Sequence, residues 1–299
     1  MILGIDPKVD YAFKYLLGRD STRDLLIDVL NRVLEPHSSH RIEEIELLNP
    51  FNLQETQDDK LSILDIKARD ESGRQFNVEM QMLAFPYYEK RILYYWSKLF
   101  QQPLQKGDEY MGLRPTISIS FLNHVLFPQS PDHHLCFHLL EDRHHFAMSE
   151  DIEFHVLELP KFAKTPAELR SGLDFWLYFL RFAEKMDAEA LAPVLQQPSI
   201  LRAVEELKML TQTDIERERY EARLKAQHDQ NTLIGYAREQ RERAEKAEKG
   251  EAIGAIHAFE RMLQRTQTPK EQLLAISQED LARLAEDLEK QVTKRLSGG

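Results

Sequence analysis

The sequence contains almost no cysteine and no long apolar run. Cys136 is the single cysteine in 299 residues, so no disulfide can form within the chain and a reducing compartment is expected. No apolar stretch reaches the roughly 18 residues that a membrane span needs. The start, MILGIDPKVD, has no basic region followed by an apolar run, as a secretory signal would. These absences predict a cytoplasmic protein with no membrane partner.

The chain also lacks an excess of basic charge. It carries 39 Lys and Arg against 50 Asp and Glu, for a net charge of -11. Non-specific binding of polyanions depends on neutralisation of phosphates by Lys and Arg, so this balance argues against a generic polyanion binder. It is compatible with a local basic groove.

The composition and length are those of a globular protein with many helices. Hydrophobic residues make up 42% of the chain and charged residues 30%. The length allows a sizeable core and a second, helical unit.

Periodicity divides the chain into a mixed part and a helical part. Helical spacing predicts helices over residues 8–34, broken at Gly18, and over residues 83–101. Strand patterns occur over residues 42–52, 61–82, 114–127, 135–146 and 151–162, and the third of these reads as a central strand. After about Pro160 the composition becomes helical. We therefore expect a core over residues 1–165, a helical segment packed on it over 166–212, and a charged helical region over 213–299.

The C-terminal region is dominated by interleaved charges. Nine acidic and nine basic residues lie between Asp214 and Gly250, with few large apolar side chains. This pattern favours a solvated helix or extended connector over a coiled coil. Two short helices are expected near Thr268 and Ser277, the second with Asp280 in a capping box. Because they have no basic recognition face, helix packing or self-association is favoured over a DNA-reading helix-turn-helix.

Residues 61–82, LSILDIKARDESGRQFNVEMQM, have the pattern of a β-hairpin with one apolar and one polar face. The first strand has an apolar face of Leu64, Ile66 and Ala68 and a polar face of Asp65, Lys67 and Arg69. The second strand has an apolar face of Phe76, Val78, Met80 and Met82 and a polar face of Gln75, Asn77, Glu79 and Gln81. A three-residue loop with Gly73 in the left-handed conformation would pair Asp70 with Arg74. Counting back in twos then places Asp65 opposite Glu79.

This register sets two carboxylates roughly 5 Å apart at Cβ. Such a pair is tolerable if it is well solvated, and useful if a divalent cation with oxygen ligands lies between the two. The simpler alternative is a wet sheet face on which Lys67 and Arg69 neutralise Asp65 and Glu79. The pattern alone does not decide between a divalent-cation site and a solvated sheet face.

At these residues the sequence resembles the PD-(D/E)XK nuclease superfamily, whose signature is an acidic residue on one strand and an acidic-x-Lys triplet on the next. More closely, it resembles the Rpn family of recombination-promoting nucleases, also described as putative transposases. The matching pieces are DYAFKYLLG (10–18), LDIKARDESGRQFNVEMQ (64–81), YYEKRILYYWSKLF (87–100), LQKGDEYMGLRPTISISFL (104–122) and HVLELPKF (155–162).

The resemblance implies an α/β, restriction-endonuclease-like core, in which helices flank a mixed sheet, with a helical C-terminal extension. It also implies a metal-dependent DNA endonuclease that hydrolyses phosphodiester bonds and is associated with recombination or mobile elements. DNA is then the expected partner. A homo-oligomer formed through the C-terminal helices is a further possibility.

The resemblance also implies roles for particular residues. Asp65 matches the signature aspartate and Glu79 the first position of the triplet, and both would bind Mg²⁺ or another divalent cation such as Mn²⁺ or Ca²⁺. The backbone carbonyl of Met80 would assist them. Asp10, on the first helix, matches an acidic position that often completes the site. Gln81 stands where the superfamily usually has lysine.

The glutamine at position 81 removes the cation expected to position the attacking water or stabilise the developing charge. Lys67 could supply a displaced ammonium group, but we favour Gln81 itself as the residue that orients water. The missing lysine also leaves open a catalytically weak or inactive protein that acts through helical self-association or partner binding.

Basic and aromatic side chains near the hairpin are candidates for DNA contact. Lys14, Lys90, Arg91 and Lys98 would form the local basic surface, although Arg91 is equally suited to pair with a buried carboxylate. The aromatic group Tyr87, Tyr88, Tyr94, Tyr95 and Trp96 has the helical spacing of a core stripe, which we favour over base stacking.

Six of the eleven histidines lie between residues 133 and 155, and His134, Cys136 and His138 alternate along one strand face. Zinc uses such ligands. A single cysteine and the absence of a second half with the usual ligand spacing favour surface histidines in a hairpin instead. Cys136 as a nucleophile is disfavoured by its apolar strand context.

Overall fold

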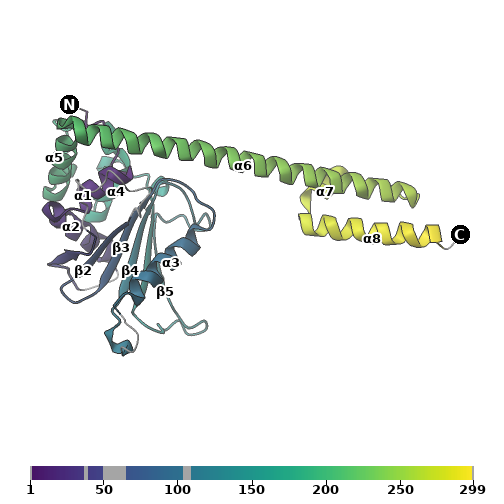
Figure 1. Cartoon of the computed structure of the whole chain (residues 1–299), viewed down its shortest axis with the longest axis horizontal. Helices are drawn as coiled ribbons and strands as arrows, with labels where there is room; N and C mark the ends of the chain where they lie inside the picture. Colours follow the sequence, from purple (N-terminus) through teal and green to yellow (C-terminus); the bar gives the residue numbers. More distant parts are fainter. Residues whose placement is uncertain (1, 37–39, 50–64, 104–108, 298–299) are drawn as a thin grey trace. The chain divides into compact units, whose positions relative to one another are not determined.

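The computed structural model describes residues 2–36, 40–49, 65–103 and 109–297 (Figure 1). The chain forms two compact units, Met1–His228 and Asp229–Gly299. The predicted boundaries between the core, the packed helical segment and the charged region, after residues 165 and 212, both lie inside the first unit. They stay predictions.

The first unit is built around a six-stranded mixed sheet with the order β1-β2-β3-β4-β6-β5. Strands β3, β4 and β6 run parallel, whereas β1–β2, β2–β3 and β5–β6 are antiparallel pairs. The strands are β1 (Ile45–Leu47), β2 (Asp65–Asp70), β3 (Gln75–Gln81), β4 (Thr116–Leu122), β5 (His134–His138) and β6 (Ile152–Glu158). The hairpin, the central strand and the later strand pair predicted from the sequence are confirmed. Residues 50–52 of the first expected strand and Leu64 lie outside the described residues.

Helices of the described residues share one apolar core with one face of the sheet. They are α1 (Asp10–Leu17), α2 (Arg23–Leu34), α4 (Gly172–Phe182), α5 (Pro198–Gln212) and the start of α6 (Asp214–Met262), which contributes Tyr220. The sheet contributes alternate residues such as Val78 and Ile119, and the ring of Phe13 on α1 lies 5.9 Å from that of Phe121. Alternation puts these side chains on one face because successive strand residues point to opposite sides.

Helix α3 (Tyr88–Gln101) covers the other face of the sheet (Figure 1). It connects the parallel strands β3 and β4, and such a crossover must pass over a face of the sheet. The polar alternates of β3 and β4 are consequently buried: Gln75, Asn77, Glu79, Gln81, Ser118 and Ser120. The interpretation of a wet sheet face is therefore wrong for β3.

The second unit holds the end of α6 (Asp214–Met262) with α7 (Lys270–Ala275) and α8 (Gln278–Ser297). Ile253, Ile256, Leu273, Leu281 and Leu288 form a small apolar core. The charged stretch predicted after Asp214 is confirmed as a helix that is mostly exposed, and Ser277 caps α8 by accepting a hydrogen bond from the Asp280 amide at 3.1 Å. No helix in the described residues has the length and apolarity of a membrane span.

Replacement of Gly73 tests the turn that joins β2 to β3. Gly73 has φ +90°, and an added Cβ would lie 3.4 Å from the Arg114 side chain. Because side-chain-bearing residues disfavour this conformation, we expect Gly73→Ala to lower the free energy of unfolding by about 1 kcal/mol, measured by urea denaturation. The control is Gly235→Ala on the exposed surface of α6, where helix propensity predicts a small stabilisation instead. An unchanged free energy for Gly73→Ala would contradict the expectation.

Candidate active site

The turn between β2 and β3 fixes which residues face each other. The Asp70 amide donates to the Arg74 carbonyl and the Gly73 amide to the Asp70 carbonyl, both at 3.0 Å. The Asp70 carboxylate accepts hydrogen bonds from Ser72 and from the backbone and side chain of Arg74. Cα pairing then places Lys67 across from Asn77 and Asp65 across from Glu79. The register predicted from the sequence is confirmed.

Glu79 lies in a buried polar layer between β3 and α3. Its side chain is 3% exposed, and its Oε1 accepts a hydrogen bond of 2.9 Å from Nη2 of Arg91. Burial raises the pKa of the Tyr88 hydroxyl well above its usual value, and the charge of nearby Glu79 adds to that rise. Ser120 on β4 is the Cα partner of Glu79.

Gln81, two residues further along β3, is also buried beneath α3. Its exposed fraction is 2%, and its Nε2 donates to the Leu83 carbonyl at 3.2 Å. Its Oε1 has no hydrogen-bond partner within the described residues. A buried amide oxygen without a partner is costly, so this atom is available to a ligand on the same face as Glu79.

The other residues predicted for the hairpin are placed less completely. The backbone of Asp65 is described as the start of β2, but its side chain lies outside the described part of the structure. Lys67 is half-buried and shares the face of Asn77, and its backbone amide donates a hydrogen bond of 2.6 Å to Oδ1 of Asn49. Met80 points its side chain into the apolar core on the opposite face.

Asp10 is a buried carboxylate at the start of α1. Burial raises the pKa of Asp10 above its ordinary value of 3.8, while the charges of Arg223 and Lys14 oppose the rise. Helix α1 packs on the sheet face opposite α3, as the contact of Phe13 with Phe121 shows. The charged neighbours of Asp10 are thus on α1 and α6, and its role beside Asp65 and Glu79 stays a prediction.

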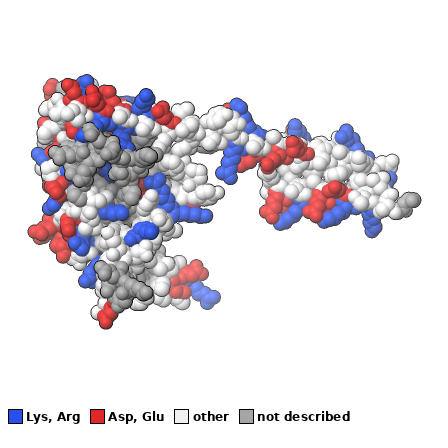
Figure 2. Space-filling view, in the orientation of Figure 1, with Lys and Arg blue, Asp and Glu red and all other residues white. Residues whose placement is uncertain are grey.

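Three of the four predicted DNA-binding residues lie on α3. Figure 2 shows Lys and Arg side chains over this part of the first unit. Lys90 and Lys98 are exposed, with Nζ atoms 4.9 Å and 5.5 Å from the ring centroids of Tyr87 and Tyr94. Arg91 instead turns toward the sheet and pairs with Glu79, which is the structural role left open by the sequence. Lys14 is on α1, over the other face.

The aromatic residues predicted as a core stripe divide between the interior and the surface. Tyr88 is fully buried, and the ring of Trp96 stacks 4.9 Å from that of Phe100. Tyr87 and Tyr94 are exposed, so the core interpretation is wrong for these two.

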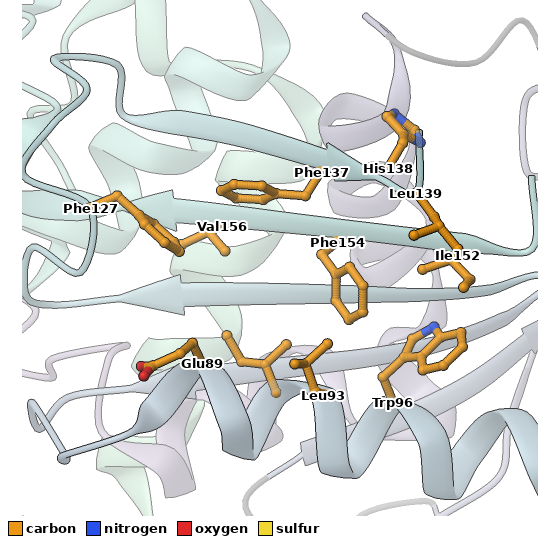
Figure 3. Close-up of a pocket in the computed structure, with 11 residues that line it drawn as sticks. Glu89, Leu93, Trp96, Phe127, Phe137, His138, Leu139, Ile152, Phe154 and Val156 are labelled. Atoms are coloured by element: carbon orange, nitrogen blue, oxygen red, sulfur yellow. The ribbon is translucent and has the colours of Figure 1, made fainter. Parts of the chain in front are cut away.

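A cavity of about 430 Å³ lies between α3 and the edge of the sheet (Figure 3). Its lining is apolar and includes Leu93, Trp96, Phe137, Phe154 and Val156. Such a surface has little to offer the phosphates of a nucleic acid, and its lining includes neither Glu79 nor Gln81.

The sequence pattern put Asn77 on the polar face of the hairpin, but it predicted neither the burial of that face nor the contribution of Ser118 and Ser120. Asn77, Ser118 and Ser120 are buried beside Glu79 and Gln81, and Oδ1 of Asn77 has no hydrogen-bond partner within the described residues. The regular alternation in TISISF was a signal, but it became informative only once α3 was known to cover the face.

Cys136 does not have the properties of a nucleophile. Burial raises the pKa of the Cys136 thiol to about 12, and the charge of Glu153 adds to the rise. Because the thiolate is the reactive form, the disfavoured interpretation of Cys136 as a catalytic residue gains no support.

Removal of Arg91 tests the ion pair inside the polar layer. Arg91→Ala would leave a buried carboxylate without its guanidinium, and we expect a loss of about 2 kcal/mol in the free energy of unfolding, moderated by the partial exposure of Arg91. Lys90→Ala, on the exposed side of the same helix, is the matched control and should change little. Equal free energies of unfolding for the two variants would refute a structural role for Arg91.

Replacement of Asp10 tests its burial through pH. Folding raises the pKa of Asp10 above 3.8, so the folded protein binds a proton at Asp10 more tightly than the unfolded chain does. The free energy of unfolding therefore falls as the pH rises from 3.8 through the pKa of the folded state. Asp10→Asn should therefore be more stable than the wild type at pH 7, and the difference should vanish in acid. Denaturation curves across pH measure this, with exposed Asp142→Asn as the control. A less stable Asp10→Asn at pH 7 would show that the charges of Arg223 and Lys14 outweigh burial.

The family model described as "PD-(D/E)XK nuclease family transposase" matches residues 7–237 of the chain. Searches of curated proteins and of solved structures found no significant match. The matched range includes the whole sheet, the hairpin with Asp65 and Glu79, and helix α3. The mixed sheet flanked by helices agrees with the fold expected of such nucleases. The chain therefore belongs to the PD-(D/E)XK nuclease family transposases.

Proposed function

We propose that this protein is a metal-dependent DNA endonuclease that hydrolyses phosphodiester bonds during recombination or the movement of mobile elements. One observation carries the proposal: the hairpin register sets Asp65 across from Glu79, and Glu79 is buried in a polar layer. Carboxylates are rarely buried without a partner or a function. Family membership points in the same direction.

The available donors suit a hard divalent cation. Asp65 and Glu79 would provide carboxylate oxygens and Met80 its backbone carbonyl, and oxygen ligands of this kind are preferred by Mg²⁺, with Mn²⁺ or Ca²⁺ as alternatives. Oε1 of Gln81, which has no hydrogen-bond partner in the part of the chain that the structure describes, adds a further oxygen on the Glu79 face. Arg91, which donates to Oε1 of Glu79, would balance the negative charge of the carboxylate pair.

In the proposed reaction, the oxygen of water forms a bond to the scissile phosphorus in line and loses a proton to solvent. The P–O bond to the sugar oxygen on the opposite side breaks, and that oxygen takes up a proton, so no covalent enzyme intermediate forms. A bound divalent cation would acidify the attacking water and stabilise the charge that develops on the phosphate. Gln81 would orient the water by hydrogen bonding, and Lys67 would supply a positive charge from the neighbouring strand. Asp10 would complete the acidic set from α1.

DNA would approach over helix α3. Lys90 and Lys98 present exposed cations there, and Arg91 would add positive charge closer to the sheet. Lys14 lies on α1, over the other face, so its proposed contact with DNA would require the DNA strand to reach past the edge of the sheet. This local basic surface would offset the net charge of -11 and make binding strongly dependent on salt. The C-terminal helices would mediate self-association, and the cytoplasm is the proposed location.

A plasmid-nicking assay tests the proposed activity. Wild-type protein with Mg²⁺ or Mn²⁺ should nick supercoiled plasmid, whereas Glu79→Gln and Asp65→Asn should reduce the rate by about 100-fold or more, because removal of a metal ligand removes charge stabilisation in the transition state. Lys90→Ala should weaken DNA binding and reduce its salt dependence without abolishing cleavage.

Glu141→Gln, a carboxylate change in the distant β5–β6 loop, is the matched control and should nick at the wild-type rate. Equal nicking rates in the wild type, Glu79→Gln and Asp65→Asn would contradict the assignment of the active site to these two residues. Gln81→Lys restores the usual residue of the superfamily. If the wild type is inactive and Gln81→Lys alone cleaves in a manner that requires Glu79, the protein is the catalytically weak descendant.

A further inference from the structure

A second group of metal-binding side chains lies at the opposite edge of the sheet, on strands β5 and β6. Cys136 and His138 alternate along β5, so they share one face. Antiparallel pairing places His138 across from Glu153 and Cys136 across from His155. The register thus gathers a thiol, a carboxylate and two imidazoles on one patch of the sheet.

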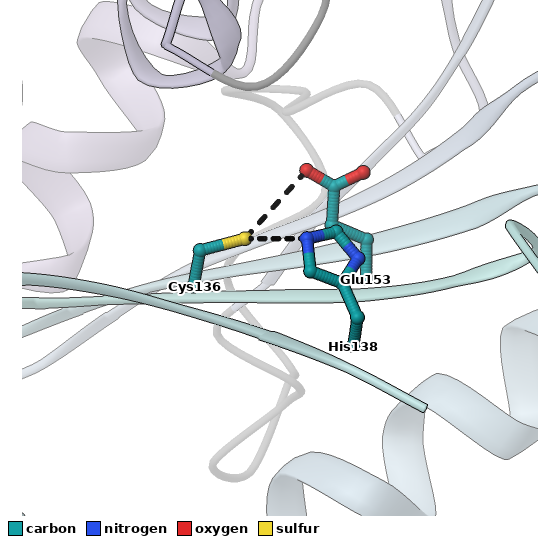
Figure 4. Close-up of side chains that lie close together, drawn as sticks. All are labelled: Cys136, His138 and Glu153. Carbon is teal, nitrogen blue, oxygen red and sulfur yellow. Dashed lines mark hydrogen bonds between the residues drawn. The ribbon is translucent and has the colours of Figure 1, made fainter. Parts of the chain in front are cut away.

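The donor atoms of this patch lie at distances compatible with a shared ion (Figure 4). Sγ of Cys136 is 3.2 Å from Nε2 of His138 and 4.0 Å from Oε1 of Glu153, and the ligand atoms of all three lie within 4.8 Å of one another. Tetrahedral zinc with its usual bond lengths requires donor separations of roughly 3.3–3.6 Å. Small side-chain rotations would bring the observed donor separations to those of tetrahedral zinc.

The buried side chain of His155 holds the carboxylate of Glu153 in place. His155 is 0% exposed, its Nε2 lies 2.5 Å from Oε1 of Glu153, and its Nδ1 lies 2.9 Å from Nε2 of His134. Hydrogen bonds of this kind to a ligating carboxylate orient it and are a usual part of metal sites. The outer ligands remain accessible, because Cys136 and Glu153 are half-buried and His138 is exposed.

We infer that Cys136, His138 and Glu153 form a binding site for a zinc-class transition-metal ion, with His155 as the positioning residue of Glu153. A thiolate and an imidazole favour Zn²⁺ over Mg²⁺. The sequence spacing showed no second set of metal ligands. The register of β5 and β6 supplies instead a single carboxylate, that of Glu153. With three protein ligands, the fourth position is open to water.

The bound ion would link the edge strand β5 to the neighbouring strand β6. β5 is the last strand of the sheet, and an edge strand has one side without a sheet partner. A site that forms only when β5 and β6 are paired stabilises that pairing through the binding free energy of the metal. By register, this patch is on the face opposite Glu79, so the inference is independent of the proposed nuclease activity.

Metal titration of the full-length protein tests the site. After treatment with a chelator, the wild type should bind one equivalent of Zn²⁺ more than Cys136→Ser, and Co²⁺ should give the absorption band of thiolate-to-cobalt charge transfer. Cys136→Ser should abolish that band and weaken Zn²⁺ binding by more than about tenfold. Glu153→Gln provides a second variant that keeps the thiol, and it should weaken binding to a similar extent.

Two controls separate this site from other sources of binding. His144→Gln changes an exposed histidine of the β5–β6 loop, and Glu79→Gln changes the proposed nuclease site; both should retain the cobalt band and the wild-type affinity. Zn²⁺ should raise the midpoint of thermal unfolding in the wild type and in these controls, but not in Cys136→Ser. A wild type without the charge-transfer band, or equal Zn²⁺ affinity in wild type and Cys136→Ser, would overturn the inference.

Discussion

The three-residue turn between β2 and β3 is the constraint on which the rest of the site depends. Gly73 takes a positive φ, and the buried Asp70 carboxylate holds the turn by hydrogen bonds to Ser72 and Arg74. A slip of one residue would move every side chain of a strand to the other face. Asp65 would then no longer face Glu79, and the polar residues of β3 would enter the apolar core. The same turn therefore secures both the core and the carboxylate pair.

Helix α3 gives Glu79 its environment. Because α3 crosses from β3 to β4, it converts what would be a solvated sheet face into a buried polar layer. Burial of polar groups is unfavourable unless they find partners. Arg91 provides one for Glu79, while Oε1 of Gln81 and Oδ1 of Asn77 have none within the described residues. Unsatisfied groups of this kind are the usual cost of a functional site.

Charge is distributed so that an acidic protein presents a basic helix. Lys90 and Lys98 lie on the exposed side of α3 while Arg91 turns inward from the same helix. Net charge describes the whole molecule, but attraction to a phosphate depends on the few charges within a Debye length of it. The two donor sets also differ in chemistry: Glu79 and Gln81 offer oxygen atoms, whereas sulfur, nitrogen and oxygen meet at β5 and β6.

The sequence alone determined the local elements, the hairpin register and the family, because strand alternation, turn chemistry and motif spacing are local properties. It predicted Asp65 opposite Glu79 from the Gly73 turn, and the resemblance carried by the residues around them is confirmed by the family match. Only the tertiary structure decided what surrounds them. The burial of Glu79, the inward turn of Arg91, the placement of Asp10 beside Arg223, and the meeting of Cys136 with Glu153 all join residues from separate elements. Such contacts follow from how helices cover a sheet and how strands joined by long connections pair, which no local pattern in the chain specifies.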